Sequence, residues 1–314
     1  MNLSKPLLSV VVPLYNESAG LAQFHKDLSK VLQKHYKNDV EIIYVNDGSQ
    51  DNTGDILKNI KDVRAVQLTR NFGKEIATTA GLHAAKGKAI LTLDGDGQHP
   101  VELIPQFVQQ WKKGAKVVVG RRIANQKEGL IKRWGSKAFY AFYGKFGGVR
   151  LTPGATDFRL IDQTVQQDFS RLSERNRITR GLIDWLGYPQ TFIDFTAKPR
   201  QSGSATYSTR KLMKLAIDSA ISLSISPLYV TAYIGALVLP LATLLGLGML
   251  GNWLLHDPLQ FHATGTAYLS ILILFLLGLV LVSQGIIGLY LSHIHAETQN
   301  RPLYIIDPER SKDA

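Results

Sequence analysis

The feature that most constrains this chain is a long C-terminal region without positive charge. No Lys or Arg occurs from Leu215 to Asn300, and the region holds two apolar stretches, Tyr229–Leu255 and Ala267–Leu291. Each stretch exceeds the roughly 20 residues that a helix needs to cross a bilayer. A buried hairpin of a soluble core is the alternative, but Pro240 and several glycines are better tolerated in membrane helices. We therefore predict a transmembrane hairpin over residues 229–291.

The charges that flank this hairpin predict its orientation. Lys211 and Lys214 precede it and basic residues follow it, whereas the connecting loop carries neither Lys nor Arg. Because the cytoplasmic flanks of membrane helices are rich in Lys and Arg, both termini are expected in the cytosol. We expect a protein of the inner, cytoplasmic membrane with two spans, a cytosolic domain over residues 1–209 and a cytosolic tail over residues 292–314.

Two further segments have the composition of helices that lie on a membrane. Residues 130–148 mix Lys and Arg with Trp, Phe and Tyr, and residues 210–228 are apolar with basic residues at their start. Such segments bind the headgroup region of a bilayer, so membrane lipids are expected partners. For residues 130–148, an ordinary amphipathic core helix is the alternative.

The composition narrows the class of partner. The formal net charge is +11, which suits phosphorylated ligands, an anionic membrane or nucleic acid. No nucleic-acid recognition motif is present, and the membrane segments explain the charge, so no nucleic acid is expected. The absence of cysteine excludes disulfides and thiolate metal sites. The sequence leaves open whether the chain forms a homo-oligomer.

The N-terminal half alternates β-branched runs with helical patterns. The predicted strands are Leu8–Val12, Val40–Val45, Val63–Leu68, Ala89–Leu93 and Lys116–Val119. The predicted helices are Ser18–His35, Asp51–Asn59, Lys74–Ala85 and Val101–Lys113. Apolar strands that alternate with helices are typical of an α/β fold with a doubly wound, mostly parallel sheet.

Polar clusters follow four of these strands, with the sequences PLYNE, NDGS, TRNFGKE and DGDGQHP. Ligands of such sheets bind beyond the carboxyl ends of the strands, so the clusters predict one binding site. No GxGxxG follows the first strand and no GxxxxGK[ST] segment occurs, which disfavours dinucleotide and P-loop sites.

Asp94 and Asp96 stand one residue apart at the end of a buried strand. Carboxylates of this kind suit Mg²⁺ or Mn²⁺, which share their ligands with substrate phosphates and water. Turn formation, helped by the neighbouring glycines, is the alternative interpretation. Asp47 has a similar ambiguity, since it could accept hydrogen bonds from a nucleotide or cap the helix that begins near Asp51.

The ordered set VVVPLYNE, VNDGSQDNT, RNFGKE, DGDGQHP and ATDFRL, followed by two apolar stretches, resembles the family 2 glycosyltransferases with a GT-A fold. More narrowly, the chain is similar to polyprenyl-phosphate glycosyltransferases, which include dolichyl-phosphate mannose synthases and bacterial undecaprenyl-phosphate glucosyltransferases. The resemblance covers about the whole chain.

The resemblance implies roles for particular residues. Those implied to bind the nucleotide sugar are Pro13, Tyr15, Glu17, Asp47, Lys74, Asp94 and Arg200. Asp94 and Asp96 are the implied metal ligands, with Asp96 the main one, and Asp157 is the implied catalytic base. Those implied to bind the acceptor phosphate are Arg121, Arg122 and Arg159. The segment after Arg200 departs from the family pattern, because Thr206 stands where many relatives have Lys; Arg210 or Lys211 could replace that Lys.

The implied activity is inverting transfer of a sugar from a nucleotide-sugar donor to polyprenyl phosphate in the inner leaflet, for cell-envelope glycans. UDP-glucose is the first choice, with UDP-N-acetylglucosamine, GDP-mannose and a modified arabinose donor as alternatives. A chain lacking Pro227–Ala314 is expected to keep most of its sugar-donor binding, with greatly reduced transfer to long-chain acceptors.

Two other functions are weighed against this one. A processive polysaccharide synthase would carry a QxxRW motif after the base, but Leu130 holds the Gln position before Arg133 and Trp134, and Asp157 follows. A nucleotide-sugar binding protein without turnover is disfavoured by the full set of acidic residues.

Overall fold

The computed structural model describes residues 5–37, 39–123, 152, 154–175, 177–196 and 265–313, with seven further positions between 237 and 254. These residues fall into two compact units. The first contains those of 5–196 together with those from Arg301 onward, and the second contains those from 237 to 300. Residues 130–148, residues 210–228, Arg200 and most of the first apolar stretch lie outside the described residues.

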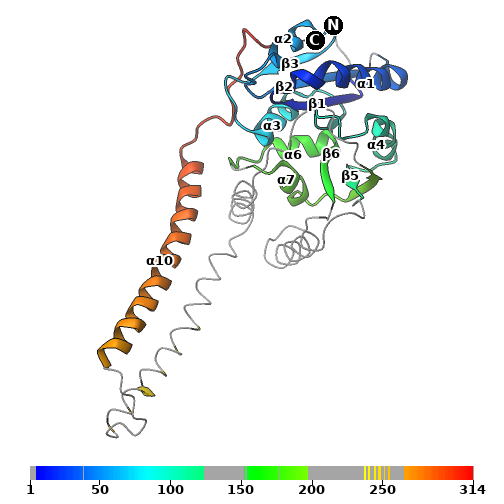
Figure 1. The fold of residues 1–314 in the computed structure, drawn as a ribbon. Helices are drawn as coiled ribbons and strands as arrows, with labels where there is room; N and C mark the ends of the chain where they lie inside the picture. The colour runs from blue at the N-terminus through cyan, green and yellow to red at the C-terminus, as the bar shows by residue number, and fades with distance from the viewer. Residues whose placement is uncertain are drawn as a thin grey trace. The chain divides into compact units, whose positions relative to one another are not determined.

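The first unit is built on a sheet with the strand order β3-β2-β1-β4-β6-β5-β7 (Figure 1). The strands are β1 (Leu8–Leu14), β2 (Val40–Asn46), β3 (Arg64–Gln67), β4 (Ala89–Thr92), β5 (Val117–Arg122), β6 (Ala155–Asp162) and β7 (Gln190–Phe195). Neighbouring strands pair in parallel except at β6, which is antiparallel to both β4 and β5. The predicted α/β fold with a mostly parallel sheet is confirmed.

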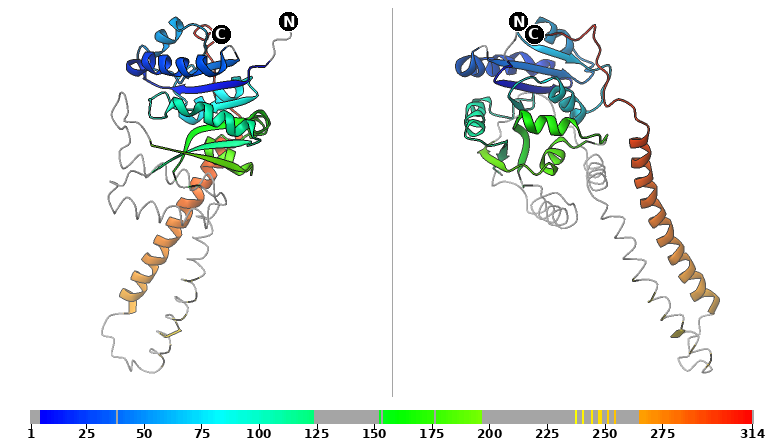
Figure 2. Two further views of the ribbon diagram at one scale, coloured as in Figure 1. Left: turned by 90° about the vertical axis from the view of Figure 1, so that its right-hand side faces the viewer. Right: turned by 180° about the vertical axis from the view of Figure 1, so that it is seen from behind.

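Helices cover both faces of this sheet (Figure 2). One face packs against α1 (Ser18–Tyr36), α2 (Thr53–Asn59), the 3₁₀ helix η1 (Val101–Leu103) and α4 (Ile104–Lys112). The other packs against α3 (Lys74–Ala84), α6 (Gln163–Ser170) and α7 (Thr179–Trp185). Because side chains alternate along a strand, Val10 and Val12 of β1 join the first core and Val11 joins the second.

The five predicted strands and four predicted helices are present, with ends shifted by a few residues. Four elements were not predicted from the sequence patterns, and all of them follow residue 150: β6, α6, α7 and β7. Simple strand–helix alternation would place β5 beside β4. Instead, the reversed strand β6 lies between them and carries the ATDFRL segment.

The second unit contains α10 (Gly265–Thr298), which spans the second predicted apolar stretch. Its window Phe275–Ser292 has a mean hydropathy of 2.0 and is not buried. Of the helices that the structure describes, this one alone is long and apolar enough to span a membrane. The seven positions between 237 and 254 are helical too. Two spans therefore remain a prediction.

Candidate active site

The reversal of β6 brings Asp157 to the acidic pair. Thr92 of β4 lies opposite Arg159 of β6, and the same register continued for two residues sets Asp94 opposite Asp157. The Thr92 hydroxyl also donates to the carbonyl of Asp157 at 2.7 Å. Residues that are far apart in the sequence therefore meet at the edge of the sheet where β4 ends.

Lys74 joins these two carboxylates. It is the first residue of α3, and its Nζ lies 2.7 Å from Oδ1 of Asp94 and 2.7 Å from Oδ2 of Asp157. The Lys74 side chain is 45% exposed, whereas the two carboxylates are 26% and 30% exposed. A cation at the sheet edge thus holds two anions from different strands together.

Electrostatics favour the charged forms of Lys74 and Asp157. Burial alone would lower the pKa of Lys74, but Asp94 and Asp157 outweigh it and raise that pKa. Burial alone would raise the pKa of Asp157, but Lys74 and then the charges of Arg180 and Arg159 hold it below its usual value. Asp157 is therefore an anion at neutral pH.

Asp47 holds the loop that leads to Lys74. Its two carboxylate oxygens accept the backbone N–H groups of Phe72 at 2.7 Å and Gly73 at 2.9 Å. Burial raises the pKa of Asp47, and these two hydrogen bonds offset part of that rise. Gly48 allows the close approach, because a Cβ on it would lie 2.3 Å from the backbone of Arg70.

The loop after β4 is packed tightly at Gly95. A Cβ on Gly95 would lie 2.4 Å from the end of the Leu14 side chain of β1, so a larger residue between the two aspartates would require Leu14 or the loop to shift. Asp96 accepts the N–H of Gln98 at 3.0 Å, which closes a local turn. The turn interpretation and the metal interpretation of this motif are compatible, because a carboxylate has about four lone-pair positions and this hydrogen bond uses one of them.

His99 supports this loop through one hydrogen bond and one ring contact. Its Nδ1 accepts the backbone N–H of Asp94 at 3.1 Å, and its ring stacks on Phe158 with centroids 5.2 Å apart. Burial lowers the pKa of His99, although Asp94 and Asp96 oppose the shift. The ring is therefore neutral, with its proton on Nε2.

The loops after β1 and β2 are joined by hydrogen bonds. The N–H of Asn16 donates to Oγ of Ser49 at 2.9 Å, and the N–H of Glu17 donates to Oγ1 of Thr53 at 3.0 Å. Asn16 adopts a positive φ of 55°, a conformation that Asn tolerates better than most residues. Tyr15, which precedes this turn, is 41% exposed and faces solvent at the same edge.

Comparisons with known proteins agree with this arrangement. Residues 9–167 match the family model described as Glycosyl transferase family 2. The chain is 38% identical to an uncharacterized glycosyltransferase of Synechocystis sp., over 95% of this chain and 94% of that one. The chain belongs to glycosyl transferase family 2. This family 2 glycosyltransferase is also 35% identical to a bactoprenol glucosyl transferase of Shigella phage SfV, over 97% of this chain and 99% of the relative.

The fold of this glycosyltransferase is also found among solved structures. Mannosyl-3-phosphoglycerate synthase from Rubrobacter xylanophilus superposes with a TM-score of 0.51 at 16% identity, over 68% of this chain and 71% of that one. With the family match, this likeness confirms the expected GT-A fold.

The glycosyltransferase gathers most of the predicted site residues at one sheet edge. They are Tyr15, Glu17, Asp47, Lys74, Asp94, Asp96, Asp157, Arg121 and Arg122. Pro13 lies inside β1, opposite Val45. Arg200 lies outside the described residues. The roles of these residues in binding and catalysis remain predictions.

Two of the predicted phosphate-binding arginines already have acidic partners. Arg159 is buried, and its Nη1 lies 2.6 Å from Oδ1 of Asp184. This burial differs from the expected phosphate contact, which needs an accessible guanidinium. Arg121 pairs with Asp194 through Nε at 2.6 Å and Nη2 at 2.9 Å, but both side chains are half-exposed. Arg122 is exposed at the end of β5.

Sequence reasoning assigned no role to three residues near the site. Glu75 accepts the N–H of Thr179 at 2.8 Å, and burial and then the charge of Asp157 raise its pKa. Arg180 contributes a positive charge that acts on Asp157. His99 stands inside DGDGQHP, so its position was a signal that could have been used. Glu75 likewise stands at the end of TRNFGKE, but its contact with α7, like the position of Arg180, depends on packing that no local pattern indicated.

The acidic pair fits a hard divalent cation of the kind expected. Among the described residues, no group of three or more His, Cys, Asp or Glu side chains is placed to hold a metal. Mg²⁺ and Mn²⁺ need no such cage, because they commonly take one or two carboxylates and complete their ligands with substrate phosphates and water. Asp94 and Asp96 supply that number.

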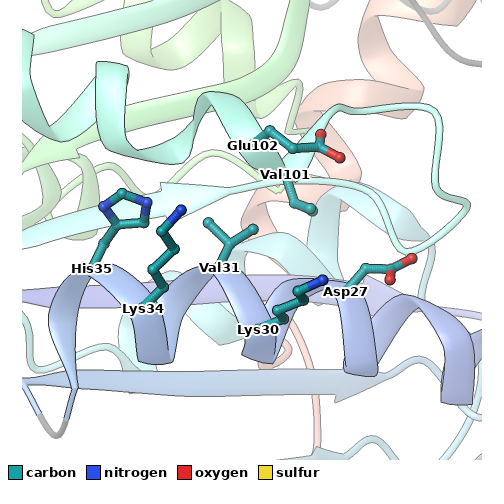
Figure 3. Close-up of a pocket in the computed structure, with 7 residues that line it drawn as sticks. All are labelled: Asp27, Lys30, Val31, Lys34, His35, Val101 and Glu102. Carbon is teal, nitrogen blue, oxygen red and sulfur yellow. The ribbon is translucent and has the colours of Figure 1, made fainter.

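A surface hollow lies elsewhere, between α1 and η1. It has a volume of about 450 Å³, and its lining includes Lys30, Lys34 and His35 of α1 with Val101 and Glu102 (Figure 3). None of the predicted site residues lines it, so it is separate from the sheet edge that carries the acidic pair.

Proposed function

We propose that this chain is a membrane-bound, inverting glycosyltransferase that moves glucose from UDP-glucose to polyprenyl (undecaprenyl) phosphate. The observation that carries the proposal is the similarity to bactoprenol glucosyl transferases over nearly the full length of both chains. The similarity extends beyond the catalytic sheet into the apolar C-terminal region, where a lipid acceptor requires membrane contact.

The sugar donor binds at the sheet edge where β1, β2 and β4 end. Tyr15 and the loop held by Asp47 contact the nucleotide. Lys74 then releases part of its contact with Asp94 and Asp157 and faces the diphosphate, where a positive charge stabilises the leaving nucleoside diphosphate. Arg200 adds a second positive charge to the diphosphate.

Asp94 and Asp96 hold Mg²⁺ or Mn²⁺ in this proposal. A bound divalent ion supplies positive charge that neutralises the diphosphate of the sugar donor. Asp96 is the main ligand. The hydrogen bond from the backbone N–H of Asp94 to Nδ1 of His99 is expected to keep the loop in place before the sugar donor arrives.

Asp157 orients groups rather than removing a proton. A phosphate monoester has a second pKa of about 6, so the attacking oxygen is already deprotonated at neutral pH. The ionised carboxylate of Asp157 instead fixes Lys74 beside the reacting centre. Arg122, which is exposed, and Arg121, once released from Asp194, are placed to bind the acceptor phosphate.

The acceptor keeps its polyprenyl tail in the bilayer, so the enzyme has to work at the membrane surface. The proposed enzyme is held there by two transmembrane helices and by interfacial contact of residues 130–148. In this arrangement the catalytic unit and both termini are cytosolic.

Radiolabelled sugar donors test the proposal directly. Purified full-length protein in membranes is incubated with UDP-glucose, UDP-N-acetylglucosamine or GDP-mannose plus undecaprenyl phosphate, with and without EDTA. We expect a lipid-linked product from UDP-glucose only, lost with EDTA and restored by Mg²⁺ or Mn²⁺. A product from another sugar donor alone would contradict the choice of glucose, and transfer that survives EDTA would contradict the metal.

A further inference from the structure

The end of the chain covers the free edge of the catalytic sheet. β3 is the terminal strand and pairs with β2 on one side, so its outward N–H and C=O groups need other partners. The N–H of Ala65 donates to the carbonyl of Lys312 at 2.8 Å, and the reverse bond is also 2.8 Å. The N–H of Thr69 donates to the carbonyl of Ile305 at 3.0 Å. We name residues Tyr304–Asp313 the edge segment.

The middle of the edge segment serves the strand as well. The N–H of Asp307 donates to the carbonyl of Gln67 at 2.8 Å, and the N–H of Gln67 donates to Oγ of Ser311 at 3.0 Å. The Ser311 hydroxyl in turn donates to the carbonyl of Asp307 at 2.6 Å. The outward N–H groups at Ala65, Gln67 and Thr69 are thus all satisfied by the edge segment.

Side chains connect the same segment to α3. The hydroxyl of Tyr304 lies 3.0 Å from Nδ1 of His83, near the end of α3. Arg64 of β3 donates to the carbonyl of Ala84 at 2.8 Å and pairs with Asp313 at 3.1 Å. The edge segment therefore contacts α3 through its first residue and, by way of Arg64, through its last.

β3 and α3 flank the loop that Asp47 holds. This loop runs from Leu68 to Gly73, and Lys74 follows it directly as the first residue of α3. An element that fixes both flanks also fixes the loop between them, and with it the placement of the Lys74 ammonium.

We propose that the edge segment is a positioning element of the sugar-donor site, which holds the β3–α3 loop so that Lys74 stands between Asp94 and Asp157. The inference rests on the proposed function only for its kinetic measurement. It revises the expectation that a chain lacking Pro227–Ala314 keeps sugar-donor binding, because that deletion removes the edge segment together with the membrane helices.

Two substitutions at Lys312 in the full-length protein distinguish the effect of its backbone hydrogen bond from the effect of its side-chain contact. Lys312→Pro removes the N–H that donates to Ala65 and also the Nζ contact to the carbonyl of Ile60 at 2.7 Å. Lys312→Ala removes only the Nζ contact. Ser311→Ala is a milder variant that deletes the acceptor of the Gln67 N–H, and Glu309→Ala is a control in the same exposed stretch.

Hydrogen exchange reads the loop without any assumption about activity. The reporters are the amides of Phe72 and Gly73, which donate to Asp47 and not to the edge segment. We expect Lys312→Pro to speed their exchange about fivefold, the effect of one ordinary hydrogen bond, and Ser311→Ala to act in the same direction. Lys312→Ala should have a smaller effect and Glu309→Ala none.

The KM values of the same variants provide a second measurement. Lys312→Pro should raise KM for UDP-glucose about fivefold and leave KM for polyprenyl phosphate unchanged. Faster exchange at Ala65 and Thr69 with unchanged exchange at Phe72 and Gly73 would overturn the proposal, because the edge segment would then only cover the strand. Wild-type protein without UDP-glucose turnover would contradict the proposed function, while the exchange data would still decide the inference. Should Lys312→Pro fail to fold, Ser311→Ala decides it.

Discussion

Lys74 lies 2.7 Å from Asp157, although the two residues are 83 positions apart in the chain. The contact depends on two features of the fold. Asp47 fixes the loop before Lys74, and the reversed strand β6 brings Asp157 to the sheet edge. The same ammonium contacts Asp94, so one positive charge joins the proposed metal loop to the proposed acceptor side.

Replacing Lys74 tests this bridge. Lys74→Met should lower the transfer rate by about 100-fold or more, because the leaving diphosphate loses a positive charge and Asp94 and Asp157 lose their shared partner. Lys74→Arg keeps the charge and should retain more activity. Initial rates with saturating UDP-glucose measure the effect, and wild-type rates in Lys74→Met would contradict the role.

Asp157→Asn tests whether this carboxylate is a base. Lys74 and neighbouring arginines hold the pKa of Asp157 low against the effect of burial, so it is ionised throughout the neutral range. We expect Asp157→Asn to reduce kcat by a similar factor at every pH from about 7 to about 9, where the acceptor phosphate is itself mostly deprotonated. A defect confined to the acidic end of a pH–rate profile would instead indicate a proton-accepting role.

Arg159 and Arg122 should respond differently to alanine. The Arg159 guanidinium is buried against Asp184, so Arg159→Ala leaves an uncompensated charge and should lower the free energy of unfolding by about 3–5 kcal/mol. Arg122→Ala, at an exposed position, should leave stability within about 0.5 kcal/mol and raise KM for polyprenyl phosphate. Denaturant unfolding and acceptor titrations check the two outcomes. A stable, acceptor-defective Arg159→Ala would restore Arg159 as a phosphate ligand.

The lowered pKa of Asp162 predicts how the stability of the catalytic unit depends on pH. Burial opposes ionisation, but hydrogen bonds from Thr164, Trp111 and Lys116 lower the pKa of Asp162 to about 2. Because the folded-state pKa lies below the unfolded value, this carboxylate stabilises the fold fully above about pH 4 and loses its contribution as the pH falls toward about 2.

The matching variant is Asp162→Asn. It should cost about 2 kcal/mol near neutral pH and show a shallower loss of stability between about pH 4 and about pH 2 than wild type. Chemical unfolding at several pH values measures both. Parallel acid profiles for the two proteins would exclude Asp162 as a source of acid sensitivity.

Gly95→Ala tests the packing under the acidic pair. The added methyl would lie 2.4 Å from the end of the buried Leu14 side chain, so Leu14 or the loop has to shift, at a cost of about 1–3 kcal/mol. We expect a lower melting temperature. We also expect a raised metal requirement, meaning a higher Mg²⁺ or Mn²⁺ concentration for half-maximal activity, because Asp94 and Asp96 are displaced. Gly87, whose Cβ would meet Ser9 at 2.6 Å at the opposite sheet edge, provides a control that lowers stability and leaves the metal requirement unchanged.

Local patterns were sufficient to predict the parallel part of the sheet and the edge at which its polar clusters gather. The runs that became β1, β2 and β4 are mostly apolar, and the polar clusters that follow them lie where parallel strands end. Polar clusters at strand ends are a local signal, so the sequence predicts Lys74 and Asp94 as site residues without information about their contact.

Other features depend on tertiary packing that no local signal carries. Nothing in ATDFRL shows that its strand runs backwards between β4 and β5, or that Arg159 turns inward to Asp184 while Asp157 remains at the edge. The partner of Glu75 is a backbone N–H on α7, a helix that the sequence did not indicate. Long-range pairing, rather than propensity, decides all three.

The covered edge of β3 also bears on how the protein is made. Gln67 and Ser311 are separated by 244 residues, so a ribosome that adds about 5–20 residues per second makes the second about 12–50 seconds after the first. Throughout that interval β3 presents an open edge, which is a template for pairing with other chains. The sheet can be completed only after the two apolar stretches have been synthesised. A protein truncated within those stretches therefore has a catalytic sheet whose β3 edge stays unpaired. We expect such a protein to aggregate.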